Sequence, residues 1–150
     1  MNLFPDLLKI KIVDVNNRPV PSIAVIIRLF ANNKNDYYLI PSISNEEGII
    51  EVDREWVNKQ INDTRNFFIM DYTSTLEDCQ SKIEIKVMDK NEANNAIEGR
   101  KLYKDFMNIP EKEIEDLSKS TNYRYFPITK LVELQTQKIK EIELTIQEIK

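Results

Sequence analysis

The feature of this chain that most constrains its fold is a succession of short apolar runs and tight turns between residues 7 and 52. The run 8–14 alternates apolar and polar residues with the period of two that a half-buried strand requires. Asn16 and Asn17 interrupt this run, and asparagine tolerates the left-handed backbone of a tight turn better than most residues with a Cβ. A later turn contains Gly48. The segment therefore predicts four strands joined by short connections.

Two further features of the apolar pattern bear on how the strands are arranged. The run 23–30 is apolar on both faces, which is typical of a central strand that is covered on two sides. Near the C-terminus the isoleucines fit either a helix or two strands, and the β-branched content favours strands. The predicted strands cover residues 8–14, 23–30, 37–43, 49–52, 67–72, 83–87, 124–135 and 138–149.

Helix signals are confined to two parts of the chain. Asp53 stands where an N-cap residue would precede a short helix. Asp89 and Glu92 have the spacing of a capping box, and apolar residues recur after them at helical intervals. Pro110 is a favourable residue for opening a further acidic helix. The predicted helical regions are a short helix near 54–61 and a helical insertion near 90–119, which includes a helix over 111–118.

The turns of the opening stretch resemble those of a known family. Residues 13–25, Val-Asp-Val-Asn-Asn-Arg-Pro-Val-Pro-Ser-Ile-Ala-Val, resemble the opening of carboxypeptidase regulatory-like, transthyretin-like β-sandwich domains. The turn 44–48 resembles a later turn of the same family. The resemblance implies a mainly β fold, an antiparallel Ig-like (transthyretin-like) β-sandwich, with the predicted helices as additions. Asn17 and Ser22 stand where the family usually has glycine.

Composition excludes several classes of function. The net charge of −4 provides no basic excess for a nucleic-acid backbone, and the absence of histidine removes the commonest general base and metal ligand. No apolar run reaches the roughly 20 residues that span a bilayer. No export signal is visible, and the single Cys79 cannot form an internal disulfide. We expect no cofactor, no metal site, and a cytoplasmic protein or an exported one that has lost its leader.

Adjacent aromatic residues are the best candidates for a binding surface. Tyr37 and Tyr38 are neighbours in a predicted strand, and Tyr123, Arg124 and Tyr125 follow the helical insertion. On a strand, one ring of such a pair enters the core and the other faces outward, where it can anchor a partner. Packing in the core is the competing interpretation for any single ring.

Candidates for catalysis are weaker. The carboxylate pairs at 46–47, 77–78 and 115–116 are adjacent in sequence, so their side chains point apart on a helix or strand. Cys79 lacks an imidazole partner. The hydrolase branch of the transthyretin-like fold uses histidines, which this chain does not have.

The sequence predicts a single β-sandwich domain over residues 1–150, acting as a non-enzymatic protein–protein interaction or assembly module. Its partner would be another protein or a second copy of the chain, and a small-molecule ligand is not indicated. Two alternatives stay open, a small acidic inhibitor or immunity-type protein and a histidine-independent hydrolase that uses carboxylates. An exposed apolar patch would favour the first interpretation, and a deep pocket of buried carboxylates would favour the hydrolase.

Overall fold

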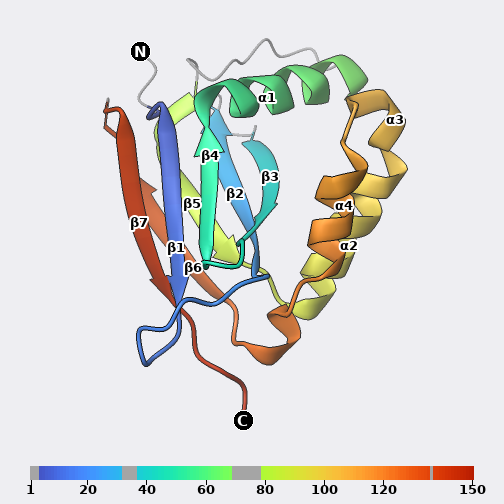
Figure 1. Ribbon diagram of the computed structural model, residues 1–150. Helices are drawn as coiled ribbons and strands as arrows, with labels where there is room; N and C mark the ends of the chain where they lie inside the picture. The colour runs from blue at the N-terminus through green and yellow to red at the C-terminus, as the bar shows by residue number, and fades with distance from the viewer. Residues whose placement is uncertain (1–3, 32–36, 69–78, 136) are drawn as a thin grey trace.

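The computed structural model describes residues 4–31, 37–68, 79–135 and 137–150, which form two facing β-sheets flanked by helices (Figure 1). Neighbouring strands pair antiparallel, except that the first and last strands, β1 and β7, pair parallel. The three-stranded sheet has the order β4-β1-β7, formed by β1 (Leu7–Val13), β4 (Ile49–Asp53) and β7 (Ile139–Thr145). The four-stranded sheet has the order β3-β2-β5-β6, formed by β2 (Ala24–Ala31), β3 (Tyr37–Ile43), β5 (Cys79–Val87) and β6 (Ile128–Glu133).

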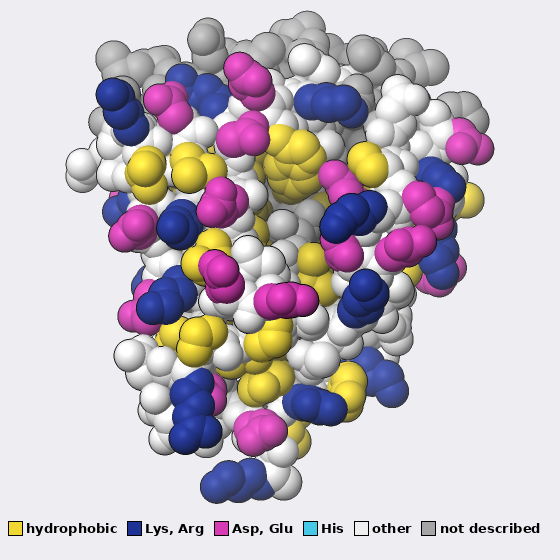
Figure 2. All heavy atoms as spheres, viewed as in Figure 1, with side chains coloured by type: hydrophobic (Ala, Val, Ile, Leu, Met, Phe, Trp, Pro, Cys, Tyr) yellow, Lys and Arg dark blue, Asp and Glu magenta, His cyan; other side chains and the backbone are white. Residues whose placement is uncertain are grey.

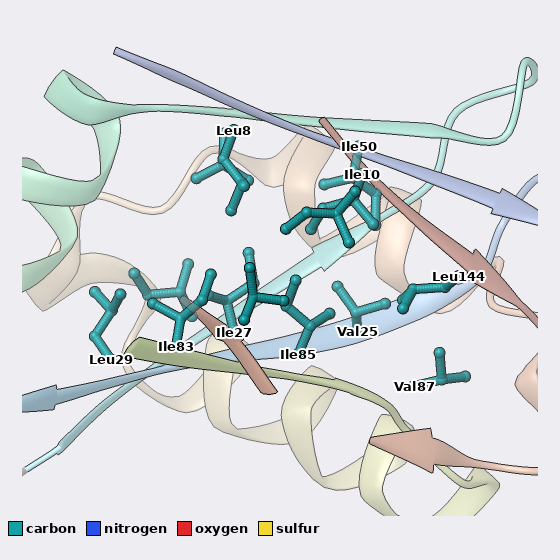
Figure 3. Packing of buried hydrophobic residues seen from close by; sticks show 14 of the residues in the cluster. Leu8, Ile10, Val25, Ile27, Leu29, Ile50, Ile83, Ile85, Val87 and Leu144 are labelled. Carbon is teal, nitrogen blue, oxygen red and sulfur yellow. The ribbon is translucent and has the colours of Figure 1, made fainter. Parts of the chain in front are cut away.

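The main core lies between the two sheets, because alternate residues of each strand point inward. Leu8, Ile10 and Ile50 of the first sheet face Ile27 and Ile85 of the second, and all five are almost fully buried (Figure 3). The predicted mainly β, two-layer architecture is therefore confirmed. The two strands predicted near the C-terminus are present as β6 and β7, so the helical alternative for this segment is wrong.

The helices pack on one flank and one end of the sheets (Figure 1). Ala24 and Ile26 of β2 point away from the main core and join a second apolar cluster with Ala93 and Leu117 of the insertion. This contact confirms that β2 is covered on both faces. The helical segments are α1 (Arg54–Phe68), α2 (Lys90–Leu102), α3 (Lys104–Met107), α4 (Glu111–Ser118) and the short 3₁₀ turn η2 (Asn122–Arg124).

One predicted strand is wrong where the structure describes it. Phe67 and Phe68 belong to α1 rather than to a strand over 67–72, and residues 69–72 lie outside the described part of the chain. An aromatic pair favours a strand only weakly, whereas a helix that has already formed extends cooperatively. The helix predicted over 54–61 is correspondingly longer. The next strand, β5, begins at Cys79 instead of Ile83.

The two turns of the opening stretch have the same construction and lie against each other. The Asp14 carboxylate accepts hydrogen bonds from the amides of Asn16 and Arg18, and Asn45 Oδ1 does the same for two amides of the second turn. The carbonyl oxygen of Gly48 accepts a hydrogen bond of 2.8 Å from the amide of Ile12, beside the first turn. These side-chain-to-backbone bonds hold both turns in place.

The capping box predicted for α2 is confirmed. Asp89 Oδ1 accepts a bond of 2.8 Å from the Glu92 amide, and Glu92 Oε1 accepts one of 3.2 Å from the Asp89 amide. The backbone hydrogen bond from Glu92 lowers the pKa of Asp89 below its ordinary value of 3.8. The native state therefore favours the ionised form of this side chain.

Replacing Asp89 with alanine is expected to lower the free energy of unfolding by about 1 kcal/mol at pH 7, because the Glu92 amide at the start of α2 loses its cap. The loss should fade as the pH falls below 3.8 through the lower native pKa, since the wild-type carboxylate is then protonated. Urea unfolding at pH 7 and pH 3 measures the difference. The Asp89→Asn variant should stay close to wild type at pH 7, and a deficit in Asp89→Ala that is equal at both pH values would contradict this account.

Candidate functional site

The chain leaves the helical insertion through η2 and then pairs with the C-terminal segment. Tyr125 and Glu148 form an antiparallel bridge, the Ile149 amide donates to the Arg124 carbonyl at 2.8 Å, and the Phe126 amide donates to a neighbouring carbonyl at 2.9 Å. In such a pairing, alternate residues share a face. Phe126 and Ile149 consequently lie on one face, Tyr125 lies on the other, and Arg124 ends η2 immediately before the bridge.

This face and the adjacent Tyr123 and Arg124 form an exposed surface at one end of the molecule, which we call the aromatic end surface (Tyr123, Arg124, Phe126 and Ile149). Tyr123 is 55% exposed, Phe126 47% and Ile149 48%. The Arg124 guanidinium lies 5.5 Å from the centre of the Tyr123 ring, and its Nε donates to the Tyr123 hydroxyl at 3.2 Å. That hydrogen bond raises the pKa of Arg124. The surface thus presents apolar side chains beside a permanent positive charge.

A buried asparagine anchors the aromatic end surface to the sheet. Asn122 is 2% exposed, and its Oδ1 accepts a bond of 2.7 Å from the Ala24 amide. Its Nδ2 donates to the carbonyl oxygens of Ala24 at 2.9 Å and Met88 at 2.6 Å. The preceding residue, Thr121, donates a hydrogen bond of 2.8 Å from its amide to the Ser22 carbonyl. The position of Tyr123 is therefore fixed from the ends of β2 and β5.

The other predicted binding residues have different surroundings. Tyr125 is half-buried against the main core, and this burial raises the pKa of its hydroxyl. Tyr38 is 3% exposed and belongs to the same core, which agrees with the competing interpretation that such a ring packs in the core. The side chain of Tyr37 lies outside the described part of the chain. Tyr38 pairs with Leu29, toward the end of β2 that is remote from Asn122.

A groove that sequence reasoning did not find lies between the open side of the two sheets and the helices. It is a cavity of about 300 Å³, which we call the acidic groove. Figure 2 shows it as a hollow with acidic side chains around its mouth. Its four carboxylates come from two elements far apart in the sequence, β4 and α4, which explains why no local motif revealed them. The groove is lined by Pro41, Ser42, Ile43, Glu51, Asp53, Trp56, Arg100, Glu113, Asp116 and Leu117.

Arg100 is the buried charge of this groove, at 8% exposure. Its guanidinium donates to Glu113 Oε2 at 2.9 Å and to Gln60 Oε1 at 3.2 Å. Its Nε has no hydrogen-bond partner among the described residues. Because Arg100 already neutralises Glu113, the remaining carboxylates leave the groove with an excess of negative charge. The pattern of charged and apolar residues in α2 did not predict that Arg100 would be buried.

The metal site, the carboxylate pairs and the thiol considered from the sequence have the following surroundings, and the pair at 77–78 lies outside the described residues. No three carboxylate or thiol side chains within the described ranges converge to hold a metal ion. Glu46, Glu47 and Glu115 are exposed to solvent. Cys79 opens β5, and its side chain lies outside the described part. Among the described helices, none combines the length and apolar character of a bilayer-spanning segment.

Comparisons with known proteins add little to the geometry. No family model matches the chain, and no curated protein matches it. Among solved structures, the Bacillus anthracis TIE protein aligns with a TM-score of 0.46 and 11% sequence identity, covering 96% of this chain. The chain spans only 16% of that protein's length. A likeness at this level does not establish a shared fold or function, so the functional argument depends on the surfaces described above.

Proposed function

We propose that this chain is a non-catalytic protein-binding module in which a β-sandwich holds the aromatic end surface in place for contact with another protein. The observation that carries this proposal is the exposure of Phe126 and Ile149 on one face, next to the exposed Tyr123 and its partner Arg124. Tyrosine, phenylalanine and arginine are enriched at protein interfaces, and tyrosine and arginine among the residues that contribute most to affinity. An exposed group of apolar side chains is typical of an interaction site.

The rigid attachment of the surface also supports this proposal. Asn122 and the bridge between Tyr125 and Glu148 already order the backbone that carries the exposed rings. A partner that binds a surface ordered in advance loses less conformational entropy on association. The stacking of Arg124 on Tyr123 restricts two long side chains in the same way. These features support direct docking of a folded partner on this surface.

We also propose that the fold is of the Ig-like, transthyretin-like type. Two backbone conformations support this assignment. Asn17 has a φ of 64° and Ser22 a φ of 59°, in the left-handed region that favours glycine. Both are positions at which the resembling family usually has glycine. The two side-chain-stabilised turns and the facing sheets agree with the same assignment.

Photo-crosslinking tests the proposed function. A benzophenone amino acid is placed at Tyr123 or, as a control, at Leu131, which is 57% exposed on the outer side of β6. In extract from the native source, we expect one discrete adduct from position 123 and none from position 131. Excess wild-type chain should compete for the adduct, whereas the double variant Tyr123→Ala with Phe126→Ala should not. Absence of an adduct at 123, or equal competition by the double variant, would overturn the proposal.

The aromatic side chains at positions 123, 125 and 126 should differ sharply in their effect on the stability of the fold. Removing the exposed rings of Tyr123 and Phe126 should change the melting temperature by less than about 2 °C, as is usual for surface substitutions. Tyr125→Ala should lower it by roughly 5 °C, because this ring packs against the core. Thermal unfolding monitored by circular dichroism provides the measurement. A comparable loss in the double variant would show that the aromatic end surface is structural.

A further inference from the structure

The acidic groove has an uncompensated negative charge. Glu113 pairs with Arg100, and Asp116 lies 4.0 Å from Lys112, whose side chain is 82% exposed. Among the described residues, no lysine or arginine forms an ion pair within 4.0 Å with Glu51 or Asp53, and the nearest cation along the sheet is Lys9, the cross-strand neighbour of Glu51. Like charges gathered beside a partly enclosed cavity repel each other and attract a cation. An anionic occupant is therefore disfavoured, and a cationic one is favoured.

The walls of the groove match a cation that carries an apolar stem. Trp56 contributes an aromatic ring, and Pro41, Ile43 and Leu117 contribute aliphatic surface. Tryptophan is the aromatic side chain that attracts cations most strongly through its ring face. Lysine and arginine side chains combine a charged head with a methylene stem that packs on apolar surface. The cavity of about 300 Å³ is large enough for one such side chain.

The protein backbone beside the groove is suited to an extended segment. β4 is an edge strand that pairs with β1. A hydrogen bond lies at each end of this pairing: the Ile12 amide donates to the Gly48 carbonyl, and the Arg54 amide donates to the Asp6 carbonyl. Backbone groups of alternate residues point in opposite directions. Those of Glu51 and Asp53 consequently point away from β1, and both residues line the groove.

Arg100 determines how much negative charge is left for an occupant. It lines the groove, it is 8% exposed, and its guanidinium donates to Glu113 and Gln60. Its charge is therefore used by Glu113, and Glu51, Asp53 and Asp116 remain for a cationic group. The backbone groups of β4 beside these carboxylates favour a peptide over a simple cation.

We propose that the acidic groove is a second binding site, which accepts an arginine or lysine side chain presented by an extended segment of another protein. The cationic head lies among Glu51, Asp53 and Asp116, and its stem packs against Trp56. The segment runs along the free edge of β4. This site is separate from the aromatic end surface and is formed by residues that the proposed function does not use.

Intrinsic fluorescence tests the proposal directly, because Trp56 is the only tryptophan in the chain. The probe is a blocked pentapeptide, Thr-Val-Arg-Val-Thr, and its matched control replaces the arginine with citrulline, which has nearly the same shape and no charge. The arginine peptide should produce a saturable change in Trp56 emission. We expect the citrulline peptide to bind at least about tenfold more weakly, since it loses the charge-assisted and cation–π interactions.

Two variants with the same change of charge test whether the arginine peptide binds in the acidic groove. The groove variant combines Glu51→Gln, Asp53→Asn and Asp116→Asn. The side-chain amide oxygen introduced at position 53 can still accept the Trp56 backbone amide, as the Asp53 carboxylate does at 2.7 Å. The control variant combines Glu47→Gln, Glu55→Gln and Glu115→Gln, all exposed and outside the groove. The groove variant should lose the response to the arginine peptide, and the control variant should keep it.

The outcomes separate this proposal from the proposed function. Equal binding of the arginine and citrulline peptides by the wild-type chain, or equal weakening by the two charge variants, would overturn the groove proposal. The first comparison needs no variant and so holds even if the groove variant fails to fold. The double variant Tyr123→Ala with Phe126→Ala should bind the arginine peptide as the wild type does. The outcome of the crosslinking experiment at Tyr123 does not depend on whether the peptide binds in the acidic groove.

Discussion

Replacing Asn122 with alanine is expected to lower the free energy of unfolding by about 4 kcal/mol, the largest effect of any substitution proposed for this protein. The side chain satisfies the amide and carbonyl of Ala24 and the carbonyl of Met88. Ala24 and Met88 are both almost fully buried. Alanine removes the partner of the Ala24 amide and of the Met88 carbonyl, whereas the Ala24 carbonyl keeps a bond of 3.2 Å from the Met88 amide. Each buried group that is left unpaired costs about 1–3 kcal/mol. Urea unfolding followed by circular dichroism measures the loss.

The control for this substitution is Asn94→Ala, at an exposed asparagine in α2. Alanine has the higher helix propensity, so this variant should be as stable as the wild type or slightly more stable. The Asn122→Ala variant should also weaken partner binding, because it releases the backbone that positions Tyr123 and Arg124. A loss of less than about 1 kcal/mol would show that neighbouring groups replace the asparagine bonds.

Replacing Gly48 with alanine is expected to cost about 3 kcal/mol, the second largest effect. Gly48 has a φ of 75°, a conformation that residues with a Cβ adopt at a cost. A Cβ built here would lie 2.8 Å from the carbonyl oxygen of Ile12 and 2.9 Å from the amide nitrogen of Val20. Those two atoms are hydrogen-bonded to each other at 2.9 Å, so they cannot move apart freely. Thermal unfolding should show a fall of roughly 10 °C.

The chain provides its own matched control in Gly99, its other glycine. Gly99 lies in α2, and a Cβ added there would meet no atom within 4 Å. Gly99→Ala should therefore raise the stability by about 0.5–1 kcal/mol, through a lower entropy of the unfolded chain and a better helix propensity. Opposite signs for the same chemical change would show that the turn geometry, and not the loss of glycine itself, is responsible. Equal effects at both sites would contradict this interpretation.

Most of the strands could be predicted because their signals are local. The alternation in β1 and the turn residues after Asp14 and Asn45 specify strand–turn–strand units without reference to the rest of the chain. The capping box at Asp89 is equally local. The parallel pairing of β1 with β7 depends instead on a contact between the two ends of the chain. No local pattern encodes such a pairing, and the sequence therefore suggested antiparallel sheets throughout.

The candidate binding surfaces could likewise be predicted from the sequence only in part. The run after the insertion was identified from adjacent aromatic residues, but only the fold shows that Tyr123 is exposed and that Tyr125 packs against the core. Tyr38 had the same local signal and is buried, since strand neighbours alternate and the inward position depends on register. The acidic groove takes its lining from β3, β4, α1, α2 and α4. A site assembled from five elements leaves no motif in the sequence.

The central claim is that the aromatic end surface binds another protein, and the affinity of the crosslinked partner tests it most directly. Isothermal titration calorimetry with the purified partner compares the wild type with the double variant Tyr123→Ala and Phe126→Ala. We predict that the double variant binds at least about 30-fold more weakly at an unchanged melting temperature, as expected when two central interface rings are removed. Wild-type affinity in the double variant would contradict the claim.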